Sequence, residues 1–457
     1  MPTRRDFVRS AAVLSAASVT SAASVASVAG AMPPADPSAP LAPPLEADEA
    51  RALLREPLTP PPGHPADAAQ DEAYWRTVAA RYRILDAPVN LEAGYFGMMA
   101  APVLEAYHRH IDAVNRASSY FARREYPKLF VAARDRVAAA LGAAPREVAL
   151  TRGATEALQA LIGQYNRVKA GDTVLYADLD YNAMQWAMNA LAQRTGATVA
   201  RLDIPEPATY ENVLAAYAAA LDAHPRTRLL LLTHCNNKTG LIIPVREIVA
   251  LAHARDVDVV VDAAHSFGQV PLSLADLGAD FVGINLHKWI GAPVGAGALY
   301  IREAKLDRID RAHADESFPI TNIGSRIHTG TTHFATVMTI PDALDFQASI
   351  GIEAKSARLR YLRDRWAIPA RAIPGVDVLT PDDPRMVGAL SAFRLKGNGD
   401  RDFNLALTRT LLDEFGIFTF ARTGIAKGDC VRVTPALYST PGDADRLVAA
   451  LRVIAQR

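Results

Sequence analysis

Apolar, β-branched runs alternate with longer stretches of helical periodicity over much of the chain. Strands that are apolar throughout and are separated by helices predict a mostly parallel sheet covered on both faces. The fold class expected is therefore α/β, with ligands bound beyond the carboxyl ends of the strands. The predicted strands are 148–151, 173–177, 198–204, 229–233, 257–262, 281–285 and 298–301. The predicted helices between them include 155–165, 182–194, 210–223 and 245–255.

The N-terminus has a different pattern, which we interpret as a targeting segment. Arg4 and Arg5 precede Phe7, and a weakly apolar run rich in Ala, Ser and Val leads to small residues at 29–31. This resembles a twin-arginine (Tat) export signal over residues 1–31, which predicts recognition by the Tat machinery and residence in the periplasm. An ordinary amphipathic helix is the alternative, although no acidic residue follows Asp6 in the run. The Ser and Thr content argues against a membrane anchor.

Residues 32–70 follow as a segment that is rich in Pro and Ala. Paired prolines occur at 33, 43 and 60–62. Such a stretch disfavours helix and sheet, so we expect an extended tether or a strap over the surface.

Composition narrows the class of partner. The chain has 457 residues, half of them hydrophobic, which is enough for more than one domain and a large core. Its formal net charge is zero and no basic block stands out, so we expect a small-molecule partner and no nucleic acid. Cys235 and Cys430 are too few for a disulfide framework.

Two strand ends carry residues suited to an anionic ligand and to a buried cation. Gly153, Ala154 and Thr155 form a short turn into a helix, whose free amides and hydroxyl suit a phosphate; a plain helix cap is the alternative. Asp262 ends a strand that is otherwise wholly apolar. A carboxylate there needs a cation or strong donors, and a protonated pyridine nitrogen would serve; a capping Asp is the alternative.

Two further strand ends carry an amine and an amide. Lys288 follows an apolar strand and is flanked by His287 and Trp289, so burial should lower its pKa and favour the neutral amine that attacks an aldehyde. A solvated surface lysine is the alternative. Asn237 follows the strand at 229–233 and could donate to a phenolate oxygen, although Asn-Asn before Gly is also common turn chemistry.

The order and spacing of these strand ends resemble fold-type I enzymes that use pyridoxal phosphate (PLP), specifically the class V aminotransferase family. The resemblance covers roughly residues 85–457 and is most specific from Asp262 through Lys288 to Gly297. It implies that Lys288 forms an imine with PLP and that Asp262 pairs with the pyridine nitrogen. It also implies a large PLP-binding domain at 101–345, a smaller α+β domain at 346–457, and an N-terminal segment at 71–100 that packs with the small domain.

The same resemblance implies further contacts with the cofactor. Tyr181 falls where the family stacks a ring over PLP, commonly His, so stacking is kept and acid-base capacity is reduced. His265 stands where family members often have Gln, and Asn285 replaces a usual Ser. The implied cofactor-binding residues are Gly153, Ala154, Thr155, Tyr181, Asn237, Asp262, His265, Asn285, His287, Lys288, Gly330 and Thr331, and no metal ligand is assigned.

Substrate and partner contacts are implied in the same way. Arg432 matches the family arginine that holds the substrate carboxylate, for which a guanidinium fork is well suited. Gly330 and Thr331 match a segment that reaches the phosphate of the neighbouring subunit, which implies a homodimer with shared active sites. Tyr95 and Phe96 lie where family members fold over the pocket; core packing is the alternative.

The resemblance favours a reaction at Cα of an amino acid or a peptide-borne amino group. The loop 421–429 contains no cysteine, which disfavours sulfur transfer, and segments 180–182 and 330–332 resemble the isopenicillin N epimerase-like branch. We expect an aminotransferase with Lys288 and Asp262 as catalytic residues. Epimerisation is the alternative, with Tyr181 as the second proton donor, followed by C-S or C-C lyase activity. An exported PLP-fold binding protein without turnover is the alternative of a different class.

Overall fold

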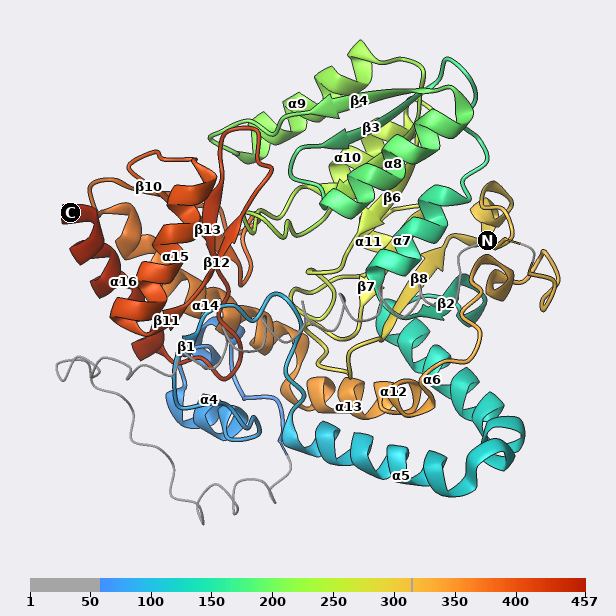
Figure 1. The fold of residues 1–457 in the computed structure, drawn as a ribbon, viewed down its shortest axis with the longest axis horizontal. Coiled ribbons are helices and arrows are strands. Elements are labelled where there is room, and N and C mark those ends of the chain that lie inside the picture. Colours follow the sequence, from blue (N-terminus) through green and yellow to red (C-terminus); the bar gives the residue numbers. More distant parts are fainter. Residues whose placement is uncertain (1–57, 314) are drawn as a thin grey trace, which may run out of the picture.

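The computed structural model describes residues 58–313 and 315–457 (Figure 1). The strands of the larger sheet are β2 (Val148–Thr151), β3 (Thr173–Ala177), β4 (Thr198–Leu202), β5 (Thr227–Thr233), β6 (Asp258–Asp262), β7 (Phe281–Asn285) and β8 (Gly297–Ile301). They are ordered β2-β8-β7-β6-β5-β3-β4. β8 is antiparallel to both neighbours and the remaining pairs are parallel. The predicted α/β class with a mostly parallel seven-stranded sheet is confirmed.

Both faces of this sheet are buried under helices. α7 (Ala154–Gly163) and α8 (Asn182–Thr195) share one apolar cluster with alternate residues of the strands. α9 (Tyr210–Ala223) and α10 (Val245–His253) share a second cluster with the residues between them. On β5, Leu229 and Leu231 belong to the first cluster and Leu230 and Leu232 to the second. Each such side chain contributes about 1.5–3 kcal/mol on burial, so a continuous apolar strand is stabilised from both sides.

The strand bounds agree closely with the sequence pattern, and the differences have local causes. β2, β3 and β7 have the predicted bounds, whereas β4 ends at Leu202 instead of residue 204. The amide of Ile204 donates to Asp178 Oδ1 at 2.9 Å, and Pro205 follows with no amide hydrogen. The chain therefore leaves the sheet two residues earlier than predicted.

The smaller part of the molecule, orange and red in Figure 1, has a separate core. Its strands are β9 (Val376–Val378), β10 (Ser391–Leu395), β12 (Phe420–Arg422) and β13 (Cys430–Val433), in the antiparallel order β12-β13-β10-β9. Its helices are α14 (Ile352–Arg371), α15 (Arg401–Phe415) and α16 (Pro441–Gln456). Trp366 and Phe393 meet edge to face in this core, with ring centroids 6.2 Å apart. The predicted small α+β C-terminal part is confirmed.

The N-terminal segment lies against this smaller part. β1 (Val89–Asn90) pairs in parallel with β11 (Ile417–Phe418), and α4 (Glu72–Ala79) precedes it (Figure 1). The short helix α3 (Pro65–Ala68) lies near the end of segment 32–70, beyond its last paired prolines at 60–62. Proline is compatible with the first turn of a helix, and the His64 ring accepts from the Ala66 amide. Residues 1–57, which carry the expected export signal and most of the tether, lie outside the described part.

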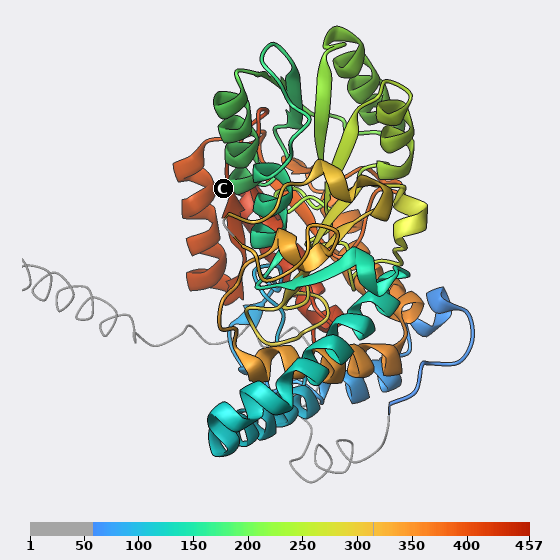
Figure 2. The same ribbon diagram turned by 90° about the vertical axis from the view of Figure 1, so that its right-hand side faces the viewer.

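Two long helices and two shorter ones lie at the bottom of Figures 1 and 2. They are α5 (Ala101–Arg124), α6 (Tyr126–Leu141), α12 (Phe334–Met338) and α13 (Ile340–Ile350). Residue 345, where the large domain was expected to end, lies within α13. The short elements are α11 (Leu274–Leu277) and the 3-10 turns η1 (Pro145–Glu147), η2 (Glu303–Arg308) and η3 (Ile323–Arg326). None of the helices in the described ranges has the length and apolar character needed to cross a membrane.

Candidate active site

The carboxyl ends of neighbouring strands bring the predicted residues together. Thr233, the last residue of β5, is paired with Asp262, the last residue of β6, and Asp262 is paired with Gly283 of β7. The turns after β6 and β7 carry His265 and Lys288. Lys288 Nζ lies 2.8 Å from His265 Nε2. The structure therefore places Lys288, Asp262 and His265 in one group at this edge of the sheet.

Burial governs the charge on Lys288. It lowers the pKa of Lys288 to about 8, even though Asp262 opposes the shift. Burial, followed by the charge on Lys288, keeps the pKa of His265 well below its ordinary value. A protonated Lys288 thus donates to a neutral His265, whose own proton is then on Nδ1, an atom without a partner among the described residues. An amine of this kind is partly neutral near pH 7.5, as capture of an aldehyde requires.

Asp262 is a buried carboxylate, only 4% exposed. Its Oδ1 accepts from the Ala264 amide at 2.9 Å. Burial raises its pKa, while the Ala264 bond and the Lys288 charge oppose the rise. A cationic partner would offset the free-energy cost of burying the ionised carboxylate. The site therefore fits a protonated pyridine nitrogen.

Asp180 is a second buried carboxylate beside Asp262, and the sequence analysis did not single it out. Thr233 Oγ1 and the Ala177 amide each donate to it at 2.7 Å. Burial raises its pKa to about 7, and Asp262 adds to the rise. The Asp-Tyr-Asn motif at 180–182 was the available signal, but the sequence did not show that Asp180 turns inward.

The turn between β2 and α7 forms a narrow cradle. The Ala154 amide donates to Asn285 Oδ1 at 2.7 Å, and a Cβ atom at Gly153 would lie 3.1 Å from both Asn285 Oδ1 and His287 Cε1. His287 Nδ1 is 2.9 Å from the Ala296 carbonyl, so Nδ1 donates and Nε2 remains available. Thr155 is exposed at the start of α7. The predicted phosphate residues thus lie close together, and the helix dipole there favours an anion.

Asn237 and Tyr181 occupy different environments. Asn237 Oδ1 is buried and has no hydrogen-bond partner among the described residues. Tyr181 precedes α8 as its N-cap residue and is exposed. Its phenol is close enough to influence the pKa of Arg422, which lies in β12. Both residues are therefore available to a ligand, as predicted for cofactor contacts.

Arg432 is paired with groups of the chain itself. Its guanidinium is fully buried, and Nη2 donates to Glu92 Oε1 while Nη1 donates to the Asn237 carbonyl at 2.6 Å. Arg422 Nη2 also donates to Glu92 Oε1, at 2.9 Å. The arginine expected to hold a substrate carboxylate is thus paired with a carboxylate of the chain itself. The sequence analysis missed Glu92 because its partners are more than 300 residues away.

The segment that contains Tyr95 and Phe96 packs against the Lys288 turn through its backbone. The Gly97 amide donates to the His287 carbonyl at 2.8 Å, and a Cβ atom at Gly97 would lie 1.8 Å from the Lys288 carbonyl oxygen. Tyr95 and Phe96 are themselves exposed, so core packing within this chain does not explain them. Phe96 lines a cavity of about 210 Å³ together with Arg83, Met98, Met99, Leu104 and Val294.

Gly330 and Thr331 are exposed on the loop before α12. The loop is anchored away from the strand ends, through Thr332 Oγ1, which is 2.9 Å from Tyr126 OH on α6. Its exposure leaves it available to a neighbouring subunit, and the structure of one chain does not bring it into the Lys288 site.

Neither cysteine is placed for sulfur chemistry. Cys235 and Cys430 are both fully buried, and burial raises the pKa of each to about 12. The thiolate is the reactive form, so both side chains are inert at neutral pH.

Comparison with known proteins shows the family and supports the assignment of the fold. Residues 99–447 match the family described as aminotransferase class-V. Isopenicillin N epimerase of Streptomyces clavuligerus is 30% identical over 402 residues, which cover 83% of this chain and 98% of that protein. A probable cysteine desulfurase of Vibrio cholerae is 30% identical over 371 residues, which cover 76% of this chain and 87% of that protein.

Solved structures share the fold at lower identity. A cysteine desulfurase of Escherichia coli superposes with a TM-score of 0.70 at 24% identity, covering 84% of this chain and 98% of that one. A mutant of C-DES, with glycine covalently linked to its PLP cofactor, has a TM-score of 0.69 at 22% identity. That alignment covers 80% of this chain and 96% of C-DES.

Proposed function

Because this chain belongs to the class V aminotransferase family of PLP-dependent enzymes, we propose that it moves the Cα proton of an amino acid or a peptide-borne amino group, with epimerisation as the outcome. The observation that carries the proposal is a partly buried Lys288 with a pKa of about 8, in contact with His265 and near Asp262. The sequence analysis preferred transamination. The similarity to isopenicillin N epimerases gives epimerisation precedence instead.

The residues present fit PLP. Lys288 would hold it covalently, Asp262 would pair with the pyridine nitrogen, and Asn237 and His265 would face the ring oxygen. The cradle at Gly153 to Thr155, with His287, would hold the phosphate. The buried and unpartnered His265 Nδ1, which carries the ring proton, supports this fit, since such a donor is costly unless a ligand satisfies it. When bound, PLP accepts the electron pair left on Cα as the proton departs.

Proton transfer is the task left to the protein. The Lys288 amine, once released from the cofactor, is a base of suitable strength, because general bases work best when their pKa is near the working pH. His265 remains neutral and orients the amine through a contact of 2.8 Å. Inversion also needs a donor on the other face of the substrate, and the exposed phenol of Tyr181 is our candidate.

Sulfur transfer through a cysteine persulfide is disfavoured, because both cysteines are buried and protonated. Elimination at a C-S or C-C bond does not need a protein thiol and remains a lower-ranked proposal. Transamination is the second candidate. It uses the same Lys288 base and differs from epimerisation in that the proton does not return to Cα. An exported binding protein without turnover is the non-enzymatic alternative.

One experiment separates these outcomes. The holoprotein is incubated with L-amino acids and short peptides in D₂O, and the products are resolved by chiral chromatography and mass spectrometry. We expect the inverted isomer with deuterium at Cα, and no product from Lys288→Ala. Oxo products with an aminated cofactor would indicate transamination, and cleaved fragments would indicate a lyase. If no product forms but the protein still binds amines, the result would support the alternative of a binding protein without turnover.

Export remains part of the proposal. The twin-arginine pattern at Arg4 and Arg5 supports transport of the folded protein to the periplasm, where a cofactor acquired in the cytoplasm would arrive already bound. Fractionation of cells that express the wild type or the Arg4→Lys, Arg5→Lys double variant tests this. Periplasmic recovery of the double variant equal to that of the wild type would refute Tat dependence.

A further inference from the structure

Hydrogen bonds hold four consecutive carbonyl groups of the turn at 287–290, which carries Lys288. The Gly97 amide donates to the His287 carbonyl at 2.8 Å, and the Gly291 amide donates to the Lys288 carbonyl at 3.1 Å. The carbonyls of the next two residues accept from side chains of α13 and α14. The backbone around Lys288 is therefore fixed by several parts of the chain at once.

Lys355 and Gln347 make these two side-chain bonds. Lys355 Nζ donates to the Trp289 carbonyl, and Gln347 Nε2 donates to the Ile290 carbonyl at 3.2 Å. The two side chains are also bonded to each other, since Lys355 Nζ donates to Gln347 Oε1 at 2.6 Å. We call this pair the brace. It connects α13 and α14 to the turn that carries Lys288.

The Lys355 amine has an unusual environment for a lysine. Its side chain is only 2% exposed, and both of its hydrogen-bond partners among the described residues are neutral groups. Burial lowers the pKa of Lys355 to about 7. Burying an amine in this way is costly, so its presence is explained by the two acceptors that it satisfies. A neutral amine still has two N–H donors, one for each acceptor, so the brace stays formed on both sides of pH 7.

The brace acts on Lys288 through the adjoining residue of the backbone. Trp289 directly follows Lys288, and Lys355 and Lys288 line one cavity of about 30 Å³. Lys288 Nζ has one hydrogen-bond partner among the described residues, His265 Nε2 at 2.8 Å. A turn released from the brace would let the amine leave this contact and reach water, which would return its pKa toward that of an ordinary lysine.

Two other titratable groups line the same cavity, the phenols of Tyr82 and Tyr438. Burial raises the pKa of both, so neither phenol ionises near neutral pH. The pH dependence of the Lys288 amine is therefore separate from theirs.

We propose that Lys355 and Gln347 are positioning residues, which hold the turn so that the Lys288 amine stays beside His265, ready to capture the aldehyde of the cofactor. The inference rests on the role proposed for Lys288, and it is independent of which product the enzyme forms. It gives a function to a buried lysine that takes no part in the chemistry itself.

Lys355→Met tests the brace, since Met has a similar size and donates no hydrogen bond. In the apoprotein, we expect faster hydrogen-deuterium exchange in the peptide that contains the Gly291 and Ala292 amides, both of which bond to carbonyls at or before Lys288. The rate of PLP capture, followed by stopped-flow absorption, should fall about tenfold at pH 7.0 and less than about twofold at pH 9.5. These changes correspond to an upward shift of about one unit in the pKa of Lys288.

Arg363→Met is the matched control, because Arg363 is also a buried cation of α14 but bonds to Thr380 Oγ1, at 2.6 Å, instead of the turn. It should leave exchange at the turn and both capture rates unchanged. Gln347→Met is the second variant if Lys355→Met fails to fold. It should change both quantities in the same direction, because it removes the Ile290 bond and one acceptor of Lys355.

The inference is overturned if exchange at the turn, or the capture rate at pH 7.0, is the same in the brace variants as in the wild type. It is also overturned if capture slows equally at pH 7.0 and 9.5, since a general loss of stability has that effect. If the wild type captures no PLP, the role proposed for Lys288 fails, and the exchange measurement alone decides whether the brace holds the turn. Products other than the inverted isomer would contradict the proposed function and leave the inference in place.

Discussion

Three lysines near the strand ends, the buried Lys238 and Lys355 and the partly buried Lys288, have different polar environments. Lys238 Nζ donates to the carbonyls of Asp178 and Gly424, and Lys355 Nζ donates to the Trp289 carbonyl and to Gln347 Oε1. These contacts commit both amines to structural roles. Among the described residues, the one hydrogen-bond partner of Lys288 Nζ is His265 Nε2. Lys288 and Lys355 both line a small cavity of about 30 Å³. Lys288 is therefore distinguished as the amine that no carbonyl group holds, which leaves it free to capture an aldehyde.

The pKa of Lys288 predicts how the apoprotein captures PLP. Below about pH 8 the amine is mostly protonated, so the rate of lysine-bound cofactor formation should rise about tenfold per pH unit and level off above pH 8. Stopped-flow absorption between pH 6.5 and 9.5 measures this rate. Lys288→Ala should give no such absorption. A rate that still rises about tenfold per unit up to pH 9.5, as expected of an ordinary lysine with a pKa near 10.4, would contradict the burial argument.

Asp262→Asn should separate cofactor binding from stability. Loss of the charge-assisted bond to the pyridine nitrogen should weaken PLP about 10- to 100-fold, as measured by equilibrium titration. The apoprotein should be as stable as the wild type or more stable at pH 7. Burial raises the pKa of Asp262 in the folded protein. The protonated side chain therefore adds to the free energy of unfolding below about pH 4, and this contribution is lost as pH rises and the folded protein's Asp262 ionises. Asn carries no such cost.

Two results for Asp262→Asn, one for the affinity for PLP and one for the stability of the apoprotein, would contradict this account. An unchanged affinity for PLP would remove Asp262 from the cofactor site. A large drop in the melting temperature of the apoprotein at pH 7 would mean that a cation of the chain already pairs with the carboxylate.

The sequence was sufficient for residues whose role follows from their position in a strand. Asp262, Asn285 and Lys288 end or follow apolar runs, and parallel pairing then places them at one edge of the sheet. It was not sufficient for the pairing of Glu92 with Arg432, which depends on how the residues after β1 meet those after β13 through the Glu92–Thr434 bridge. A charged residue in a short segment gives no signal of a partner 340 positions away.

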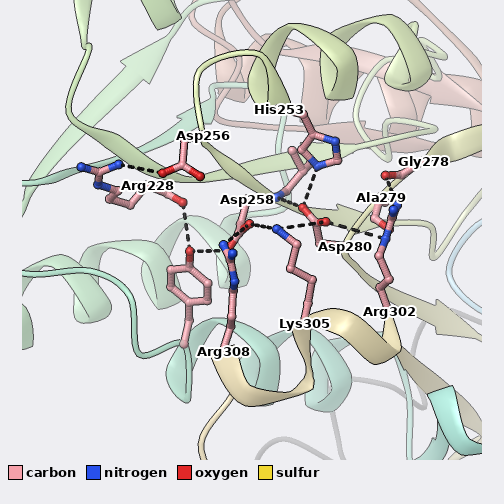
Figure 3. A network of polar contacts seen from close by, with 12 residues as sticks. Arg228, His253, Asp256, Asp258, Gly278, Ala279, Asp280, Arg302, Lys305 and Arg308 are labelled. Carbon is pink, nitrogen blue, oxygen red and sulfur yellow. Dashed lines mark hydrogen bonds and ion pairs between the residues drawn. The ribbon is translucent and has the colours of Figure 1, made fainter.

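β6 carries charged groups at both ends, and only one end faces the site. Its first residue, Asp258, accepts from Tyr165 OH at 2.7 Å, from Lys305 Nζ at 2.8 Å and from Arg308 Nη1 at 2.6 Å. Figure 3 shows Asp258, Lys305 and Arg308 beside Asp280, which is bonded to His253. Asp258 is nearly fully buried. The network fixes the ends of the strands that lie away from Lys288.

Removing the charge of Asp258 should destabilise the protein and leave the site chemistry unchanged. Breaking a buried ion pair costs about 3–5 kcal/mol, and the partial exposure of Lys305 and Arg308 should reduce the cost of Asp258→Asn to about 2–3 kcal/mol. Urea denaturation of the apoprotein measures it. Burial pushes the pKa of Asp258 up, but the bonds from Arg308 and Lys305 bring it below its ordinary value. The difference between wild type and variant should therefore be present above about pH 4 and disappear as pH falls below it.

A loss below 0.5 kcal/mol would contradict this account of the network. Asp256→Asn is a suitable control, since Asp256 is highly exposed and its contact with Arg228 is long, at 3.5 Å. Such a surface pair contributes little.

Strands buried on both faces were the elements best predicted from sequence, because their apolar runs are continuous. The strands of the small sheet were not predicted individually. β10, for example, includes Arg394, whose guanidinium is buried through bonds to Glu206 and Gly428. A charged residue in the middle of a buried strand interrupts the apolar pattern, and its partners are known only from the fold.

The N-terminal segment links the two parts of the molecule at the site. Val89 pairs with Ile417 in the small part, while Gly97 contacts the Lys288 turn of the large part. Glu92 lies between these two contacts and reaches Arg422 and Arg432. Movement of this segment would therefore change the Lys288 turn and the arginine pair together.

The proposed homodimer predicts complementation between two inactive variants. Lys288→Ala lacks the amine, and Thr331→Glu places a negative charge where the exposed loop would meet the neighbour's phosphate. Hybrids contain one intact site, so random reassociation of equal amounts should restore about a quarter of the wild-type activity. Activity assays after mixing, with native mass spectrometry to verify hybrids, measure this. Hybrids without activity would show that the sites are not shared.

The central claim is that one lysine carries the cofactor, and borohydride reduction of the holoprotein followed by peptide mass mapping tests it most directly. The account predicts a reduced pyridoxyl phosphate adduct on Lys288 alone, with Lys238 and Lys355 unmodified because their amines are held by carbonyl groups. An adduct on either of those lysines, or a protein that remains colourless and unlabelled in excess PLP, would contradict it.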